Sequence, residues 1–431
     1  MRMVRCGGER CQLLVDVAGA PPQHWRVKRI PDWLLALSAT MLAQSASSFM
    51  GQCLPVVAPL LTRSNGLAPE RIGNLSSLTS LGTCLFLAFG SPILARLGPV
   101  RSLQFGSILA VAGMAIAASG SWIGLVCASL LLGLGYGPTP PSGSRILART
   151  APPAHRTLIF SIKQAGAPAG GALAGLIVAP FAVEHGWPLA LLLAVAVGMI
   201  SAIAIAPLRE LMDEERDPAR SVHPRVIFSV ANVMTPLRAL TGNPAMVSIT
   251  ALALSFALVQ GVLFSFSVTY LTEIGMPLAE AGLAYACLQG AGVFARVFLG
   301  FLADRTGRPA ANLTVQAFVA AACVVAYASL SGDQPMPLTV AVALLTGFFG
   351  CSWNGIYMAE IARLAPPAQI ADASSGSTLI VFLGYVAGPS IFAAMVPVWG
   401  WHLPFMIAAG QLVLVAVVQA VLLMRAPVTA R

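Results

Sequence analysis

The chain has 431 residues, of which 57% are hydrophobic and only 10% are charged. A water-soluble protein carries about 25% charged residues, so this composition excludes an ordinary soluble enzyme or binding domain. The net charge of +9 would suggest nucleic acid as a partner of a soluble protein. Here the charges gather in a few polar segments between apolar runs, and no nucleic-acid partner is expected.

Apolar runs long enough to cross a bilayer recur along the whole chain. About 20 helical residues span the hydrocarbon core, and helices are expected because unpaired backbone groups are costly in lipid. The sequence therefore predicts an all-α membrane protein. Twelve transmembrane helices are expected, at residues 34–60, 74–95, 102–119, 122–146, 158–182, 188–207, 246–270, 279–302, 311–330, 337–362, 374–396 and 402–424.

Positive charges lie on one side of this arrangement. With a cytoplasmic N-terminus, only Arg63 and Arg71 of the 25 lysines and arginines fall on the outer side. Cytoplasmic loops of membrane proteins carry an excess of positive charge. The distribution therefore predicts that both termini lie in the cytoplasm.

A long polar connection divides the twelve spans into six plus six. Within it, residues 226–240 could form an amphipathic helix on the inner surface. Gly-Trp pairs open the sixth and twelfth spans, at Gly186 and Gly400, which favours a duplicated unit with a substrate site near the bilayer midplane. The expected segments are a cytoplasmic tail at 1–32, a helical bundle at 33–207, a cytoplasmic linker at 208–245, a second bundle at 246–424 and a tail at 425–431.

One short polar motif separates the eighth and ninth spans. Residues 300–308 read Gly-Phe-Leu-Ala-Asp-Arg-Thr-Gly-Arg. This motif resembles the loop motif of the major facilitator superfamily of secondary transporters. The resemblance implies a conformational latch in which Asp304 accepts from helix N-terminal amides or from an arginine. The latch residues are Gly300, Asp304, Arg305, Gly307 and Arg308.

The corresponding turn after the second span is eroded. Ala95 stands where the motif has its aspartate, so the N-terminal half is expected to lack its latch carboxylate. In the fourth span, Ser129 takes the place of the family's arginine. Three prolines in the same span, Pro138, Pro140 and Pro141, predict a kinked or broken helix, since each removes a helix hydrogen bond.

The resemblance covers residues 33–424 and has clear implications for architecture. It implies two pseudo-symmetric six-helix bundles that rock around a central site by alternating access. It also implies a monomer in the lipid bilayer, most naturally a bacterial inner membrane, with a small solute as its partner and a proton as its coupling ion.

Polar side chains in the first and seventh spans are candidates for binding the solute. Gln44, Ser48 and Gln52 are four residues apart and form one stripe of the first span. Gln260 lies in the middle of the seventh span, which is its repeat partner. Polar groups at this depth usually face a cavity, and hydrogen bonding between helices is the alternative.

The eighth span carries Tyr285, Gln289 and Arg296 on one helical face. The run Phe294-Ala295-Arg296, with Gly300 four residues on, is similar to the eighth span of monocarboxylate carriers. There the arginine is implied to pair with a substrate carboxylate, which suits its planar fork. A snorkelling or latch arginine is the alternative.

Further candidates come from the fifth and tenth spans. Lys163 would draw an anion toward the inner cavity, or would simply add to the inner positive charge, and Gln164 follows it. In the tenth span, Trp353, Asn354 and Tyr357 are candidate cavity residues, with packing in the helical core as the alternative for Trp353. Glu360 is the candidate for proton coupling, or it forms an inner-surface salt bridge. These residues complete the candidate site.

The sequence contains no motif for cofactor or catalytic chemistry. It lacks the Gly-x-x-x-x-Gly-Lys phosphate loop, and its histidines fall in tails, loops or span ends. Cys6 and Cys11 lack further metal ligands nearby. No enzyme, cofactor or metal site is expected. The expected function is secondary transport of a small organic anion resembling a monocarboxylate.

The alternative function is a drug or multidrug efflux antiporter of the same superfamily. Gly384, Gly388 and Pro389 match the Gly-x-x-x-Gly-Pro spacing found in the fifth span of the family's antiporters, although here they fall in the eleventh span. Close helix packing explains the same residues. Export of cationic drugs usually requires a buried carboxylate, and no acidic residue lies deep in any predicted span.

Overall fold

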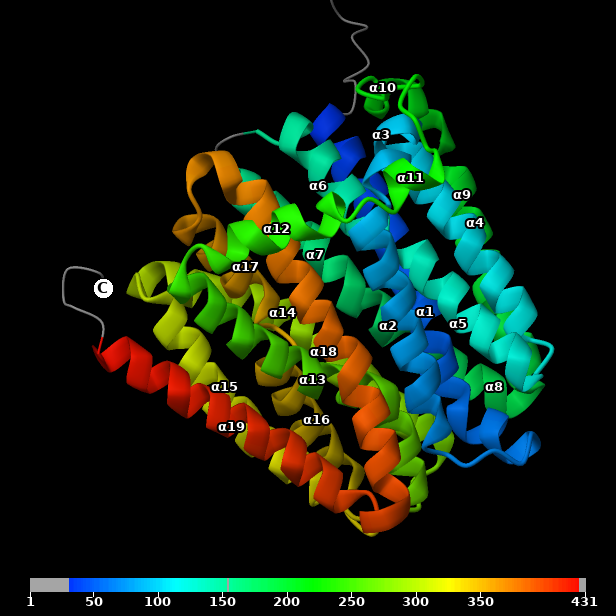
Figure 1. Ribbon diagram of the computed structural model, residues 1–431. Coiled ribbons are helices and arrows are strands. Elements are labelled where there is room, and N and C mark those ends of the chain that lie inside the picture. Colours follow the sequence, from blue (N-terminus) through cyan, green and yellow to red (C-terminus); the bar gives the residue numbers. More distant parts are fainter. Residues whose placement is uncertain (1–30, 153–154, 426–431) are drawn as a thin grey trace, which may run out of the picture.

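The computed structural model describes residues 31–152 and 155–425, and this part of the chain is helical without any strand (Figure 1). Eleven of its helical segments are long and apolar enough to cross a membrane. The prediction of an all-α membrane protein is confirmed. Most of the expected tails, at 1–30 and 426–431, lies outside the described residues.

The twelfth long helix is α1 (Asp32–Ser64), with 33 residues. It is too polar to count among the eleven, because it carries the glutamines and serines of the predicted stripe. Twenty of its residues are buried, so its neighbours are protein rather than lipid. A polar helix can cross the membrane at this position because other helices shield it.

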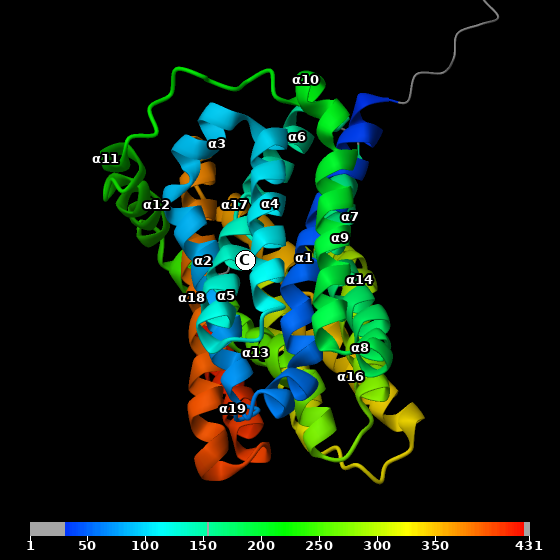
Figure 2. The same ribbon diagram turned by 90° about the vertical axis from the view of Figure 1, so that its right-hand side faces the viewer.

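The first half surrounds α1 with helices that alternate in direction (Figure 2). They are α2 (Arg71–Phe89), α3 (Ser91–Leu97), α4 (Pro99–Ala117), α5 (Trp122–Tyr136), α6 (Thr139–Thr150), α7 (Arg156–Leu173), the π-helical turn η3 (Ala174–Val178), α8 (Ala179–His185) and α9 (Trp187–Ala204). The short 3₁₀ turn η4 (Ala206–Leu208) leads out of this half.

The second half follows the same plan. Its elements are α13 (Pro244–Glu273), α14 (Leu278–Thr306), α15 (Pro309–Ala328), α16 (Met336–Gly350), α17 (Asn354–Leu364), the 3₁₀ turn η5 (Pro367–Gln369), α18 (Ile370–Trp399) and α19 (His402–Arg425). Like α1, α13 is largely buried, so the first helix of each half lies near the centre of the molecule.

The fourth membrane segment of each half is interrupted. α5 ends at Tyr136 and α6 begins at Thr139, which confirms the break predicted from the prolines. The equivalent break between α16 and α17 was not predicted and contains no proline. There the Ser352 hydroxyl donates to the Phe348 carbonyl, and the carbonyl of Cys351 accepts from an arginine of α14. Interrupted helices in equivalent positions of two repeats commonly mark a transporter's binding site.

The connection between the halves arches over one end of the molecule (Figure 2). It contains α10 (Arg209–Met212), α11 (Pro224–Ile227) and α12 (Ala231–Thr241). The single amphipathic helix expected at 226–240 is therefore divided at residues 228–230. α12 packs closely on the start of α18, where Gly376 lies against the Pro236 carbonyl.

A carboxylate from this connection binds the first loop turn. Asp213 is buried and accepts from the backbone N–H groups of Val100 and Arg101, at 2.6 and 3.2 Å, and from the Arg101 guanidinium at 2.9 Å. The turn lacks the carboxylate of the motif itself, since residue 95 is alanine, and Asp213 supplies one from outside the motif. Gly98 has φ +83°, and a Cβ there would lie 2.8 Å from the Asp213 carboxyl carbon, so only glycine fits.

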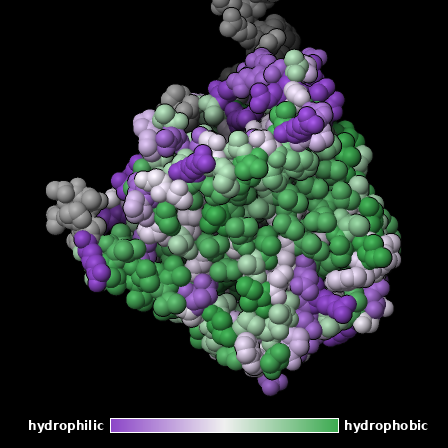
Figure 3. Space-filling view, in the orientation of Figure 1, coloured by the Kyte–Doolittle hydropathy of each residue, from purple (hydrophilic) through white to green (hydrophobic). Residues whose placement is uncertain are grey.

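The surface matches a protein embedded in lipid. Hydrophobic residues cover the middle of the face seen in Figure 3, and hydrophilic residues gather at the end where α3, α6 and α10 lie. Large apolar side chains such as Ile123 and Phe294 are more than 70% exposed. In water this exposure would be unfavourable, whereas in a bilayer it places apolar groups against lipid tails.

Candidate functional site

A cavity of about 660 Å³ lies between the two halves. Its walls come from α1, α2, α3, α5, α6 and α7 on one side and from α13, α14, α17 and α18 on the other. The lining reaches Ser91, Arg145 and Ser374, which lie toward the end covered by the connection between the halves. The cavity therefore extends from mid-depth toward that end.

The opposite end is closed by tight contacts between the halves. A Cβ on Gly73 of α2 would collide with the Phe266 ring of α13 and with the Pro389 carbonyl of α18. Gly175 of η3 lies similarly close to Gly282 of α14, where a Cβ would be 2.6 Å from the carbonyl oxygen. These glycines allow the ends of the bundles away from the connection to meet, so among the described residues the two halves are in close contact at the end opposite to the one that the cavity approaches.

Nine of the predicted substrate-binding residues line this cavity. They are Gln44, Ser48, Gln52, Gln164, Gln260, Arg296, Trp353, Asn354 and Tyr357. Two others, Tyr285 and Gln289, are buried beside it without lining it. The Tyr285 hydroxyl donates to the Gln52 side-chain oxygen at 2.6 Å, so this pair joins the two halves at the edge of the cavity.

Gln260 has an orientation fixed by two donors. Its side-chain oxygen accepts from the Trp353 indole N–H and from the Tyr385 hydroxyl, each at 2.9 Å. An indole nitrogen can only donate, so the oxygen must face Trp353. The amide NH₂ of Gln260 has no acceptor among the described residues and belongs to a side chain that lines the cavity. It offers two N–H donors there.

Arg296 bridges the two halves at the cavity wall. Its guanidinium donates to the Gln164 carbonyl of α7 at 2.6 Å and more weakly to the Cys351 carbonyl at 3.4 Å. Its Nε–H is buried without a partner in the described structure. No ion pair within the described residues involves this arginine, so its charge has no fixed counter-ion.

Sequence reasoning missed a second cavity cation, Arg145 of α6. It was missed because positive charge near an inner span end was assigned to the general cytoplasmic excess. Both arginines line a cavity whose described lining contains no aspartate or glutamate. The electrostatic character of the site is therefore positive, which favours an anion.

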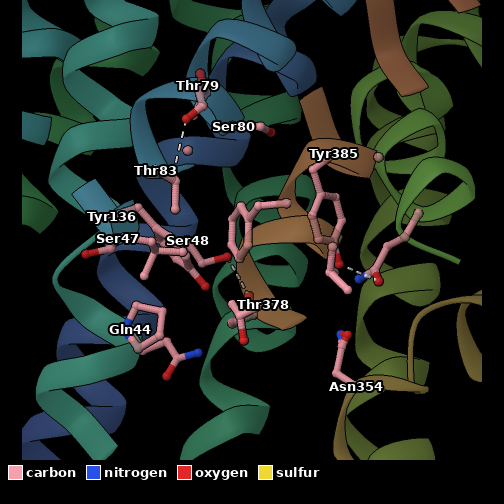
Figure 4. Close-up of a pocket in the computed structure, with 18 of the residues that line it drawn as sticks. Gln44, Ser47, Ser48, Thr79, Ser80, Thr83, Tyr136, Asn354, Thr378 and Tyr385 are labelled. Carbon is pink, nitrogen blue, oxygen red and sulfur yellow. Dashed lines mark hydrogen bonds between the residues drawn. The ribbon is translucent and has the colours of Figure 1, made fainter. Parts of the chain in front are cut away.

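A row of hydroxyl side chains on α2 was also missed. Ser76, Thr79, Ser80 and Thr83 line the cavity at the i, i+3, i+4, i+7 spacing of one helical face. In Figure 4, Thr79, Ser80 and Thr83 lie on one side of the hollow, and Asn354 and Tyr385 lie on the other. The spacing was visible in the sequence, but serine and threonine are common in membrane helices and gave no signal above that background.

Lys163 and Glu360 lie away from the cavity lining. Lys163 is 1% exposed, and its side chain fills the space beside Gly143 of α6. Glu360 is 3% exposed and receives two hydrogen bonds of 2.7 Å from Arg363. This geometry favours the salt-bridge alternative for Glu360 in the present conformation. Among the described residues, no cluster of histidine, cysteine and acidic side chains could hold a metal ion.

The turn after α14 has the geometry of a helix end. Gly307 adopts φ +64° as the left-handed cap of α14, and its N–H donates to the Ala303 carbonyl. Asp304 and the arginines beside it are exposed, and none makes an ion pair within the described part of the chain. The latch role predicted for this motif stays a prediction.

The helical halves around one central, one-sided cavity define a membrane solute carrier. The sequence profile of the Major Facilitator Superfamily matches residues 40–375, so the chain belongs to this superfamily. The family makes the protein a multi-pass transporter rather than an enzyme.

Two solved structures share the fold. A bacterial homologue of the human lysosomal transporter Spinster, inward-facing and occupied, gives a TM-score of 0.70 at 17% identity over 89% of this chain and 95% of that one. The peptide transporter POT in complex with sulfate gives 0.71 at 16% identity over 92% and 95%. At these identities the likeness concerns the fold alone.

Two named relatives are similar in sequence. The hexuronate transporter of Bacillus subtilis (strain 168) is 26% identical over 151 residues, which are 35% of this chain and 36% of that protein. The gallate transporter of Pseudomonas putida is 24% identical over 324 residues, or 67% of this chain and 69% of that protein. The first match thus spans little more than a third of its relative.

Proposed function

We propose that this protein is a secondary active carrier that moves a small organic anion across the membrane by alternating access. The observation that carries this proposal is the charge of the cavity, which is lined by two arginines and by no carboxylate within the described lining. Hexuronate and gallate, named for the two relatives, are both organic carboxylates. The cavity size falls in the ordinary range for small-molecule sites.

Arg296 and Gln260 are the proposed carboxylate-binding groups. The arginine has an unpartnered Nε–H, and the amide of Gln260 presents N–H donors because its oxygen is engaged. Hydrogen bonds between charged or polar donors and a carboxylate are the stronger kind. Since Arg296 also contacts α7 through the Gln164 carbonyl, a ligand bound there would touch both halves, as alternating access requires.

Efflux of cationic drugs gains no support from the cavity. The glycines that match the antiporter spacing pack against α13, where a Cβ on Gly384 would be 2.7 Å from the Leu254 carbonyl oxygen and one on Gly388 would be 2.6 Å from the Leu258 carbonyl oxygen. Close helix contact explains their identity. We propose a bacterial inner-membrane location, with the cavity mouth and both termini cytoplasmic and a proton as the coupling ion.

Uptake into proteoliposomes tests the proposal. Arg296→Gln removes a charge-assisted contact of roughly 1.5–3 kcal/mol, so carboxylate affinity should fall about 10- to 150-fold. Arg225→Gln, an exposed arginine of the connection, is the matched control and should transport normally. An inward proton gradient should drive accumulation. Undiminished uptake by Arg296→Gln would remove this residue from the binding site.

A further inference from the structure

Four of the hydroxyl groups that line the cavity share one hydrogen-bonding state. Thr79 donates to the Leu75 carbonyl at 3.1 Å, and Ser80 donates to the Ser76 carbonyl at 3.1 Å. On the facing helix α18, Ser375 and Thr378 also donate to backbone carbonyls, at 2.8 and 2.7 Å. A hydroxyl has one proton and two lone pairs. These groups have used their protons and can offer the cavity only acceptor lone pairs.

An additional acceptor lies on α1. Gln44 is 2% exposed and lines the same cavity, and its side-chain oxygen has no donor in the described structure. A buried acceptor without a donor is costly, so this oxygen marks a position where a ligand donor is missing. Gln44, Thr79 and Ser80 together are named the acceptor wall.

The proposed carboxylate donors and the acceptor wall come from different halves. The second half contributes N–H donors and a positive charge through Gln260 and Arg296, whereas the acceptor wall belongs to the first half, which also contributes the charge of Arg145. A simple fatty or short monocarboxylate would satisfy the donors and leave the wall unpaired. An ammonium ligand would satisfy the wall but would meet two arginines with no carboxylate to offset them.

We propose that the carried anion is a polyhydroxylated carboxylate, whose carboxylate binds Arg296 and Gln260 and whose hydroxyl groups donate to the acceptor wall. This inference rests on the proposed function and adds to it the class of substrate and the residues that select it. Since the wall and the donors belong to opposite halves, such a ligand spans the interface that opens and closes. Hydroxyl groups on the anion thus contribute to recognition by the first half.

Binding to the detergent-purified full chain, measured by thermal shift and calorimetry, tests this with two matched probe pairs. Gluconate and hexanoate share an open six-carbon chain and differ in their hydroxyl groups, and gallate and benzoate share an aromatic ring and differ in theirs. The hydroxylated member of at least one pair should bind at least about tenfold more tightly than its partner, since each neutral hydrogen bond contributes roughly 1 kcal/mol, or about fivefold. The pair that shows the difference tells whether the skeleton is aliphatic or aromatic.

Variants of the acceptor wall then test whether its residues cause the preference for the hydroxylated probe. The double variant Thr79→Val and Ser80→Ala should weaken the hydroxylated probe roughly tenfold and leave its partner unchanged. Thr79→Ser keeps the acceptor oxygen and should retain binding. Thr314→Val is the matched control, because Thr314 also donates to the carbonyl four residues before it, at 2.8 Å, but does not line the cavity.

These measurements distinguish failure of the substrate proposal from failure of the proposed function. Equal binding within both pairs, or equal losses for both members in the wall variants, overturns the hydroxylated substrate and leaves the anion carrier standing. Absence of binding by all four carboxylates overturns the proposed function, and the hydroxylated substrate with it.

Discussion

Replacing Gln260 by glutamate separates the two roles of this side chain. Glutamate has the same shape, and its oxygen can still accept from the Trp353 indole N–H and the Tyr385 hydroxyl, which both lie 2.9 Å from the present oxygen. The other end changes from an N–H₂ donor to an acceptor that is negative when ionised. The helix contacts are therefore kept while the anion-binding donor is lost.

The expected loss of affinity is large. A hydrogen bond to a charged group is worth roughly 1.5–3 kcal/mol. Repulsion between two unit charges about 5 Å apart adds about 3 kcal/mol at an effective dielectric constant of 20. Solvent in the open cavity reduces the second contribution, so a fall of at least roughly 100-fold in carboxylate affinity is expected. Calorimetry on the detergent-purified protein measures it directly.

Gln260→Leu is the complementary variant. It leaves the Trp353 and Tyr385 donors unpaired, which should lower the stability of the protein by about 1–3 kcal/mol without adding a negative charge to the cavity. The two variants should therefore differ in opposite ways. Gln260→Glu should have the lower affinity for anions, and Gln260→Leu should have the lower melting temperature. Wild-type affinity in Gln260→Glu would refute the assignment of the amide N–H groups to the carboxylate.

Three further predictions concern the turn at Asp213 and the contact between the halves at Gly73. Asp213→Ala leaves the buried N–H of Val100 unpaired and should lower stability by about 1–3 kcal/mol, seen as an earlier melt; an unchanged melt would contradict the capping role. Burial raises the pKa of Asp213. The hydrogen bonds from the N–H groups of Val100 and Arg101 and the charge of Arg101 lower it, but burial has the larger effect. The protonated carboxyl therefore stabilises the folded protein. This contribution is complete below about pH 4 and is lost as the pH rises through the pKa of Asp213 in the folded state. Asp213→Asn should remove this pH dependence of the melting temperature. Gly73→Val should open the contact with Phe266 and Pro389, so that a cysteine at Ser76 reacts with an impermeant thiol reagent added on the side opposite the cavity mouth. Protection equal to that in the parent would show that the contact holds without glycine.

Local sequence patterns predicted the membrane helices well because hydropathy is a property of a short window. The break in the fourth span was predicted because proline acts within its own helix turn. The break between α16 and α17 was not predicted, because it contains no proline, and the donors that its backbone carbonyls meet include an arginine from another helix, α14. The carboxylate of Asp213 was missed for the same reason, because it lies more than 100 residues from the turn that it binds.

Some residues of the candidate site were likewise predictable from the sequence, and others were not. Gln260 and Arg296 were found because polar groups inside an apolar span are rare and therefore informative. The hydroxyl row of α2 was missed because serine and threonine are tolerated in any membrane helix. Tyr285 and Gln289 share a helical face with Arg296, yet they lie at the closed contact between the halves rather than in the cavity lining.

The sequence by itself determined that this chain crosses the membrane many times, in two similar halves, and that it carries cations but no acid deep in its spans. Those properties follow from the transfer of residues between water and lipid, which each segment experiences separately. Only the tertiary structure decided which polar groups meet in one cavity, which amide presents its N–H groups and which membrane side is open. These depend on how the helices of the two halves rotate and pack against one another, and no single segment contains that information.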